Sequence, residues 1–124
     1  MRREQAVVYA GGSEKALRKY ATDRALSQIN ASWFAYQQAG VVFRGRPRST
    51  FTVSAVDLSK VPATATVSEC LDTSGWTAVY KATGRTAARA GQVRRYTVIH
   101  TVQIYGAARQ WMDVNFTADK GLPC

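Results

Sequence analysis

The spacing of apolar residues changes once along this chain, at Gly40, and that change limits the folds that the chain can adopt. Before Gly40, apolar residues recur every three or four positions, which is the period of a helix. After Gly40, apolar and polar residues alternate, which is the period of a strand. Helices followed by a run of strands predict an α+β fold, with the helices packed on one face of an antiparallel sheet.

Three helical segments are expected before the change of period. Glu4–Ala10 resembles the end of a first helix, and residues 1–12 are therefore interpreted as a stub that is truncated. Ser13–Ala21 and Thr22–Ala39 both begin with residues that cap helices well. Gly40 supplies the left-handed residue that commonly ends a helix. The longer helix carries one apolar stripe, made of Leu26, Ile29, Trp33 and Tyr36.

About six strands in a meander are expected after Gly40. Turn residues such as Asp72-Thr73-Ser74-Gly75 separate the alternating stretches. With 124 residues the chain is predicted to form one domain over residues 1–124, and no stretch approaches the roughly 18 apolar residues of a membrane helix. The expected strands are Val41–Arg46, Phe51–Leu58, Ala63–Leu71, Trp76–Lys81, Val93–Tyr105 and Arg109–Ala118.

The charge of the chain favours an acidic partner. Seventeen Lys and Arg against eight Asp and Glu give a net charge of +9, but no block of five or six like charges forms a basic tail. We interpret this as a solvated basic surface that attracts polyanions weakly, for example an anionic cell-envelope polymer, without a specific nucleic-acid site. Trp111 and Tyr105 are the aromatic residues expected to be partly exposed. The candidate polyanion contacts are Arg44, Arg46, Arg48, Arg94 and Arg95.

The two cysteines, Cys70 and Cys124, allow three interpretations: a disulfide, a metal pair or unrelated core residues. A zinc site is excluded, because His100 is the only histidine and no further cysteine lies at ligand spacing. A disulfide would close a loop of about 55 residues, worth roughly 4 kcal/mol in the chain-entropy model. It would also indicate an oxidising compartment.

A series of short motifs in a fixed order resembles the NTF2-like superfamily, and more narrowly small secreted proteins and lipoproteins of actinobacteria. The motifs cover most of the chain from Ala16 onward, although Glu69 stands where similar sequences often carry Asp. They are Ala16-Leu17-Arg18-Lys19-Tyr20-Ala21-Thr22, Gly45-Arg46-Pro47-Arg48, Ala63-Thr64-Ala65-Thr66-Val67, Cys70-Leu71-Asp72-Thr73-Ser74-Gly75-Trp76, Arg95-Tyr96, Trp111-Met112 and Pro123-Cys124.

This resemblance implies a cone of helices against a curved antiparallel sheet. It also implies an exported domain, secreted or tethered to the cell envelope, with a Cys70–Cys124 bridge. Residues Met1-Arg2-Arg3-Glu4 do not begin a signal peptide, so export would require a leader that this sequence does not include. Homodimers are common for the fold, and the apolar stub is expected to dock on a second copy or another protein unless it folds back to complete the cone.

His100 is the residue for which a catalytic and a structural interpretation compete most directly. It shares one face of the longest expected strand with Tyr96, Val98, Val102 and Ile104. These apolar neighbours favour a core histidine satisfied by one backbone or hydroxyl partner. The alternative is a general base in a pocket whose other candidates are Asp72, Tyr36 and Trp76.

The remaining carboxylates give no clear catalytic pattern. Asp72 is expected to cap its own turn. Asp113 is expected on a solvent-exposed face with Trp111, Asn115 and Thr117, opposite Met112, Val114 and Phe116. No nucleophile triad, phosphate loop or metal motif is present, so neither a metal nor a cofactor is expected.

The sequence is therefore interpreted as a non-enzymatic protein-interaction or ligand-binding module of the cell envelope. One alternative is a small-molecule isomerase-like or hydrolase-like enzyme with a pocket around His100. A second alternative is a weak polyanion-binding domain.

Overall fold

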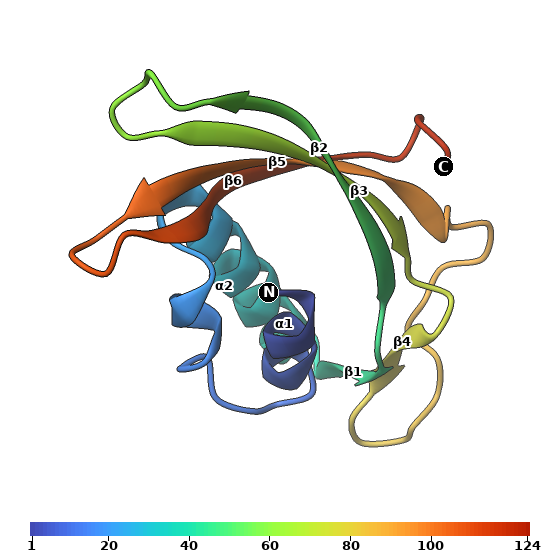
Figure 1. Ribbon diagram of the computed structural model, residues 1–124. Coiled ribbons are helices and arrows are strands. Elements are labelled where there is room, and N and C mark those ends of the chain that lie inside the picture. Colours follow the sequence, from blue (N-terminus) through green and yellow to red (C-terminus); the bar gives the residue numbers. More distant parts are fainter.

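A curved antiparallel sheet with two helices on its concave side forms the framework of the computed structural model, which describes all residues from Met1 to Cys124 (Figure 1). This confirms the predicted α+β class. In chain order the elements are α1 (Arg2–Tyr9), a 3₁₀ turn (Leu17–Lys19), α2 (Asp23–Gln38), β1 (Val41–Gly45), β2 (Arg48–Asp57), β3 (Thr64–Asp72), β4 (Trp76–Tyr80), β5 (Arg95–Tyr105) and β6 (Gln110–Asp119).

The strands form two sheets, so the predicted meander is wrong. β2, β3, β5 and β6 pair in that order, while β4 leaves the series and pairs with β1. The bend at Gly45 separates the two sheets. Gly45 has a φ of +81°, and a Cβ there would lie 2.1 Å from the carbonyl oxygen of Gly75. Only glycine allows this approach, which lets the Arg46 amide donate to that carbonyl.

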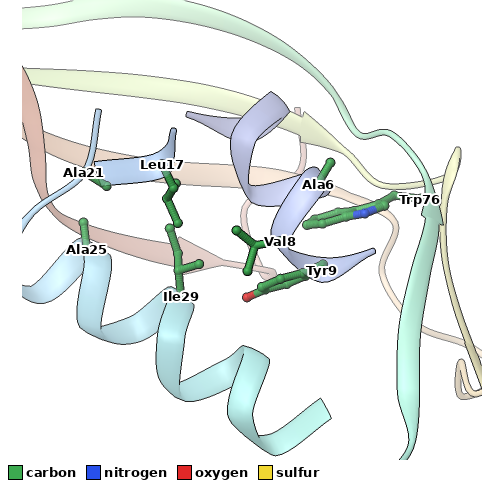
Figure 2. Close-up of a cluster of buried hydrophobic side chains, with 8 residues drawn as sticks. All are labelled: Ala6, Val8, Tyr9, Leu17, Ala21, Ala25, Ile29 and Trp76. Atoms are coloured by element: carbon green, nitrogen blue, oxygen red, sulfur yellow. The ribbon is translucent and has the colours of Figure 1, made fainter. Parts of the chain in front are cut away.

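The core lies between the helices and the concave face. Tyr9 of α1 stacks on Trp33 of α2 and on Trp76 of β4, so that one aromatic ring joins three elements. Figure 2 shows the buried apolar cluster from which this contact extends. The cluster consists of Ala6, Val8, Tyr9, Leu17, Ala21, Ala25, Ile29 and Trp76.

The N-terminal stub folds back into this core. Val8 is 1% exposed and Tyr9 is buried, whereas Val7 is 51% exposed. Most of the apolar surface that predicted a docking partner is therefore already covered within the chain. A homodimer or a protein partner stays a prediction. The apolar residues of the helical side no longer support it, because most of them are buried within the chain.

The helix predictions agree with the structure unevenly. The Thr22–Ala39 prediction is confirmed by α2, and Gly40 has the expected positive φ of +70°. The Ser13–Ala21 helix is wrong, because only the 3₁₀ turn Leu17–Lys19 forms there. The Ser13 hydroxyl accepts a hydrogen bond from the Lys15 amide, two residues on, which closes a local turn instead of capping a helix.

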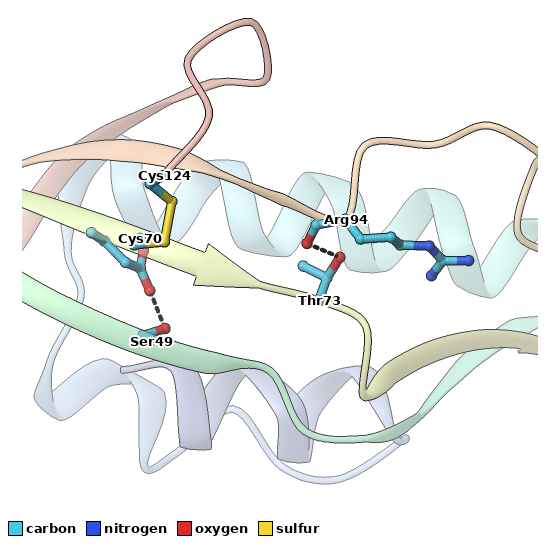
Figure 3. Close-up of a disulfide and its surroundings, with 6 residues drawn as sticks. Ser49, Cys70, Thr73, Arg94 and Cys124 are labelled. Carbon is cyan, nitrogen blue, oxygen red and sulfur yellow. Dashed lines mark hydrogen bonds between the residues drawn. A yellow bond between two sulfur atoms is a disulfide. The ribbon is translucent and has the colours of Figure 1, made fainter.

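A disulfide between Cys70 and Cys124 fixes the C-terminus to β3, across 54 residues of sequence (Figure 3). Their Cα atoms are 5.7 Å apart. The Thr97 amide of β5 also donates to the carbonyl of Leu122, so the terminal segment lies along the sheet. The expected bridge is confirmed. None of the helices has the length and apolar character needed to cross a membrane.

Candidate functional site

His100 lies at the centre of a buried ionic network on the concave face. Its Nε2 is 2.7 Å from Oε1 of Glu69, and its Nδ1 is 2.5 Å from Oδ2 of Asp113. Glu69 is completely buried, and Asp113 is 7% exposed. The Arg2 guanidinium donates to both oxygens of Glu69, at 2.8 and 3.1 Å, and the Ser49 hydroxyl donates to Oε2. Two cationic groups thus face two carboxylates inside the protein.

Strand register brings these groups together. Glu69 is paired with Val98 and Asp113 with Val102, so the two carboxylates flank His100 diagonally from the neighbouring strands. Diagonal neighbours on one face of a sheet are within reach of long side chains. Arg2 reaches the network from α1, which packs over the same face. With Ser49 from β2, the network therefore links α1, β2, β3, β5 and β6.

The predicted solvent exposure of Asp113 is wrong. A bulge in β6 shifts its register between the Thr101–Asn115 pair and the Val102–Asp113 pair. Beyond a bulge, side chains move to the other face of the sheet. Asp113 therefore points to the concave side together with Phe116, which simple alternation had placed on the opposite face. No residue type in this stretch marks the bulge.

The predicted environment of His100 is also wrong. It was expected to meet one backbone or hydroxyl partner, but both ring nitrogens meet carboxylates. The pairing of His100 with Asp72 is wrong as well. Asp72 accepts hydrogen bonds from the amide and hydroxyl of Ser74, which confirms the expected turn cap. It lies three residues beyond Glu69 on β3, and alternation places it on the convex face.

The network shifts the pKa values of Glu69 and His100 in opposite directions. Burial alone would raise the pKa of Glu69, but hydrogen bonds from His100, Arg2 and Ser49 lower it to about 2. Burial alone would lower the pKa of His100, but hydrogen bonds to Asp113 and Glu69 raise it above its ordinary value of 6.5. His100 is thus held as an imidazolium between two carboxylates. It has no free nitrogen to accept a proton or to hold a metal.

A cavity of about 560 Å³ lies between the concave face, the helices and the β4–β5 connection. Tyr36 and Trp76, two of the predicted pocket residues, line it, but His100 and Asp72 do not. Sixteen of its 25 lining residues are hydrophobic. Its charged lining residues are all basic, and Trp76 adds a buried indole N–H without a hydrogen-bond partner. These basic residues are Arg2, Arg89, Arg94 and Lys120.

A smaller cavity of about 270 Å³ lies on the other side of the network, towards the tips of the β2–β3 and β5–β6 hairpins. His100 and Asp113 line it among apolar side chains such as Phe51 and Trp111. Oδ1 of Asp113 is buried and has no hydrogen-bond partner. Each cavity is therefore lined by a residue with one unpaired polar atom, a donor in the larger and an acceptor in the smaller.

The five arginines predicted as polyanion contacts lie around one turn, between β3 and β4. Arg48 and Arg95 are the direct strand partners of Asp72. Arg46 donates its amide to Gly75, and the carbonyl of Arg94 accepts hydrogen bonds from the amide and hydroxyl of Thr73 (Figure 3). Arg44 completes the group as the partner of Thr77. All five side chains are exposed.

Sequence reasoning missed the roles of Arg2, Glu69 and Asp113. Glu69 carried a usable signal, because it alternates with Val67 and Leu71 on the buried face of its strand. A carboxylate at such a position requires a buried cationic partner. Arg2 carried no such signal, since its contact with Glu69 spans 67 residues.

Comparison with known proteins supports the fold only. No protein-family model and no curated protein matches this chain. Among solved structures, the chain is similar to the crystal structure of the intermembrane space region of the chloroplast protein ARC6. The two are 17% identical, with a TM-score of 0.52, and the match covers 99% of this chain and 89% of the other. At this identity the likeness extends to the arrangement of the elements and not to activity.

Proposed function

We propose that this chain is a non-enzymatic, NTF2-like binding module. It binds an amphipathic anion, with an apolar body and one anionic group, in the cavity beneath its curved sheet. The observation that carries the proposal is the lining of that cavity, which is mostly hydrophobic and contains four basic residues but no carboxylate. Its volume of about 560 Å³ lies within the roughly 300–1,000 Å³ of small-molecule sites.

The ligand class follows from this lining. An aliphatic or aromatic body would pack against Tyr36, Phe43 and Trp76, which line the cavity. A carboxylate or sulfonate group would pair with Arg89, Arg94 or Lys120 and could accept from the unpaired indole N–H of Trp76. Charge-assisted hydrogen bonds of this kind are about twice as strong as neutral ones.

The disulfide supports a location outside the cytoplasm. Bridges persist in oxidising compartments and are rare where thiols are kept reduced. The similar solved structure is also described as an intermembrane space region. Both points favour the predicted extracytoplasmic location, secreted or attached to the cell envelope.

A ligand titration tests the proposal. Decanoate, decanol and decylamine share one apolar chain and differ in the charge of the head group. We expect decanoate to change the tryptophan fluorescence and to bind about tenfold more tightly than decanol, because one charge-assisted hydrogen bond is worth about that factor. Decylamine should bind most weakly, since the basic lining repels it.

A matched pair of variants locates the binding. Ala118 lines the cavity, whereas Thr117 is exposed on the opposite face of β6. Ala118→Phe should fill part of the cavity and abolish decanoate binding, and Thr117→Phe should leave it unchanged. Equal binding by the three probes, or an unchanged affinity in Ala118→Phe, would refute the proposal.

The smaller cavity supports a second candidate function, an isomerase-like or hydrolase-like enzyme. The free Oδ1 of Asp113, beside the His100 imidazolium, is the only group of the network placed to exchange a proton with a molecule in that cavity. A panel of ester, epoxide and ketone substrates tests this function. Turnover that Asp113→Asn abolishes, without a change in melting temperature, would favour the enzyme over the binding module.

A further inference from the structure

We propose that the arginine rim, defined as Arg44, Arg46, Arg48, Arg94 and Arg95, binds a linear polyanion that carries phosphate charges and no bases. This proposal does not depend on the ligand proposed for the cavity. Of the five arginines only Arg94 also lines that cavity. The rim surrounds the β3–β4 turn, where residues far apart in sequence are brought together by strand pairing.

Strand pairing places two of the rim arginines on the convex face, whereas Arg94 lines the cavity on the concave side. Arg48 and Arg95 flank Asp72 on the convex face, and their Cα atoms are two inter-strand spacings apart, or roughly 10 Å. Arg44 and Arg46 approach the same turn from β1 and the segment that follows it. A chain with regularly spaced charges can contact several of these groups at once.

The guanidinium groups of the rim are free to bind. None of the five arginines takes part in an ion pair, whereas Arg2 and Arg18 do. Asp72 is the one carboxylate that lies among the rim residues, and its pKa is lowered first by the hydroxyl and amide of Ser74 and then by Arg95 and Arg48. The rim therefore keeps a strong local excess of positive charge.

The position of the aromatic residues argues for recognition by charge alone. Binding of single-stranded nucleic acid combines a basic groove with aromatic rings on which the bases stack. Tyr105 is half-exposed, but it lies at the opposite end of β5 from Arg95, roughly 34 Å away along the strand. Trp111 is next to that same end, because it pairs with Ile104.

The other exposed rings also lie away from the rim. Phe51 is on the concave face, within 6.5 Å of the His100 ring, and Tyr80 ends β4 on the side away from the turn. Tyr20 and Phe34 belong to the helical layer, where Tyr20 follows the 3₁₀ turn and Phe34 lies in α2. None of these exposed rings is therefore interleaved with the arginines. Nucleic-acid bases would therefore gain no stacking energy from these rings, and a phosphate chain without bases does not need it.

Calorimetric titration with long-chain inorganic polyphosphate tests the proposal, with oligothymidylate of equal charge as the comparison. We expect polyphosphate to bind more tightly than the oligonucleotide. Its affinity should fall by about tenfold or more between 50 and 200 mM salt, as expected when several phosphates are neutralised. Arg48→Gln with Arg95→Gln should weaken binding and reduce the salt slope by about 1–2. Neither residue lines the cavity.

The control removes the same charge elsewhere. Arg3 and Arg24 are exposed on α1 and α2, and Arg3→Gln with Arg24→Gln leaves the same net charge as the rim variant. We expect it to bind polyphosphate almost normally. Should the rim variant fail to fold, Arg44→Gln with Arg46→Gln tests the other side of the turn. Three results would each overturn the proposal: an equal loss of polyphosphate affinity in the rim and control variants, tighter binding of oligothymidylate than of polyphosphate, or an affinity that does not change with salt concentration.

Discussion

Glu69 and Asp72 lie three residues apart on β3, but they belong to two different regions. The charges around Glu69 are buried and paired, whereas those around Asp72 are exposed to solvent. On the concave face, Glu69 is buried against His100, Arg2 and Ser49. On the convex face, Asp72 lies in an exposed turn between Arg48 and Arg95. The same three strands, β2, β3 and β5, contribute to both regions.

The difference between the two regions comes from burial. Removing one partner of a buried ion pair leaves an uncompensated charge in a medium that solvates it poorly. An exposed charge is solvated by water and screened by salt, so its contacts contribute little to stability. The concave charges are therefore expected to hold the fold together, and the convex charges remain available to a partner.

The largest effect is expected when the buried region loses its central carboxylate. Glu69→Ala should lower the free energy of unfolding by about 3–5 kcal/mol, because Arg2 and His100 lose a shared partner. Urea denaturation measures this change in the free energy of unfolding. Asp72→Ala is the matched control on the same strand. A loss below about 1 kcal/mol in Glu69→Ala would show that the network does not stabilise the fold.

Reduction of the disulfide tests the convex side of β3. The bridge spans 54 residues, and the chain-entropy model gives it about 4 kcal/mol as an upper figure. Cys70→Ser with Cys124→Ser should therefore lower the urea midpoint substantially. If the two forms unfold at the same urea concentration, the stability of the sheet does not depend on its tie to the C-terminus.

The pH dependence of stability separates the two groups of charges. Glu69 has an ordinary pKa of 4.5 that folding lowers to about 2, so its contribution is present above pH 4.5 and is lost as the pH falls towards 2. The shift corresponds to about 3 kcal/mol at most. The raised pKa of His100 makes its contribution full below pH 6.5, and this contribution is lost as the pH rises through the raised value.

Unfolding free energy is thus expected to be greatest between pH 4.5 and 6.5. In His100→Gln the decline on the alkaline side should disappear, which provides the control. A wild-type stability that rises steadily from pH 6 to 9 would contradict the ionised state assigned to His100.

The smallest effect is expected at the exposed carboxylate. Asp72→Ala removes a turn cap and should lower the stability only slightly, far less than Glu69→Ala does. It should also strengthen polyphosphate binding slightly, since it removes the one negative charge between Arg48 and Arg95. Weaker polyphosphate binding in this variant would indicate that Asp72 positions the rim rather than opposing it.

The parts of the fold that depend on local sequence could be predicted. The bounds of α2 follow from the apolar stripe and Gly40, and the six strands follow from alternation and turn residues. The pairing of β4 with β1 could not be predicted, because it depends on the close approach of Gly45 and Gly75, which are 30 positions apart. The Asx turn at Asp72 was predicted because it involves only neighbouring residues.

The buried site was predicted only at its centre. Alternation placed His100 on the concave face, but its partners come from other strands and from α1. The bulge in β6 reversed the prediction for Asp113. The arginine rim was named residue by residue, and pairing then showed that its members surround a single turn. Local patterns identify which residues share a face, whereas the register between distant strands decides which of them meet.

One pair of measurements on the same samples tests the division between the two regions most directly: urea unfolding and polyphosphate titration of His100→Gln and of Arg48→Gln with Arg95→Gln. The account predicts that His100→Gln loses about 2–3 kcal/mol of stability and keeps its polyphosphate affinity. It predicts that the rim variant keeps its stability within about 0.5 kcal/mol and loses affinity. The account would be contradicted if both variants lost both stability and affinity. It would also be contradicted if His100→Gln lost only affinity and the rim variant lost only stability.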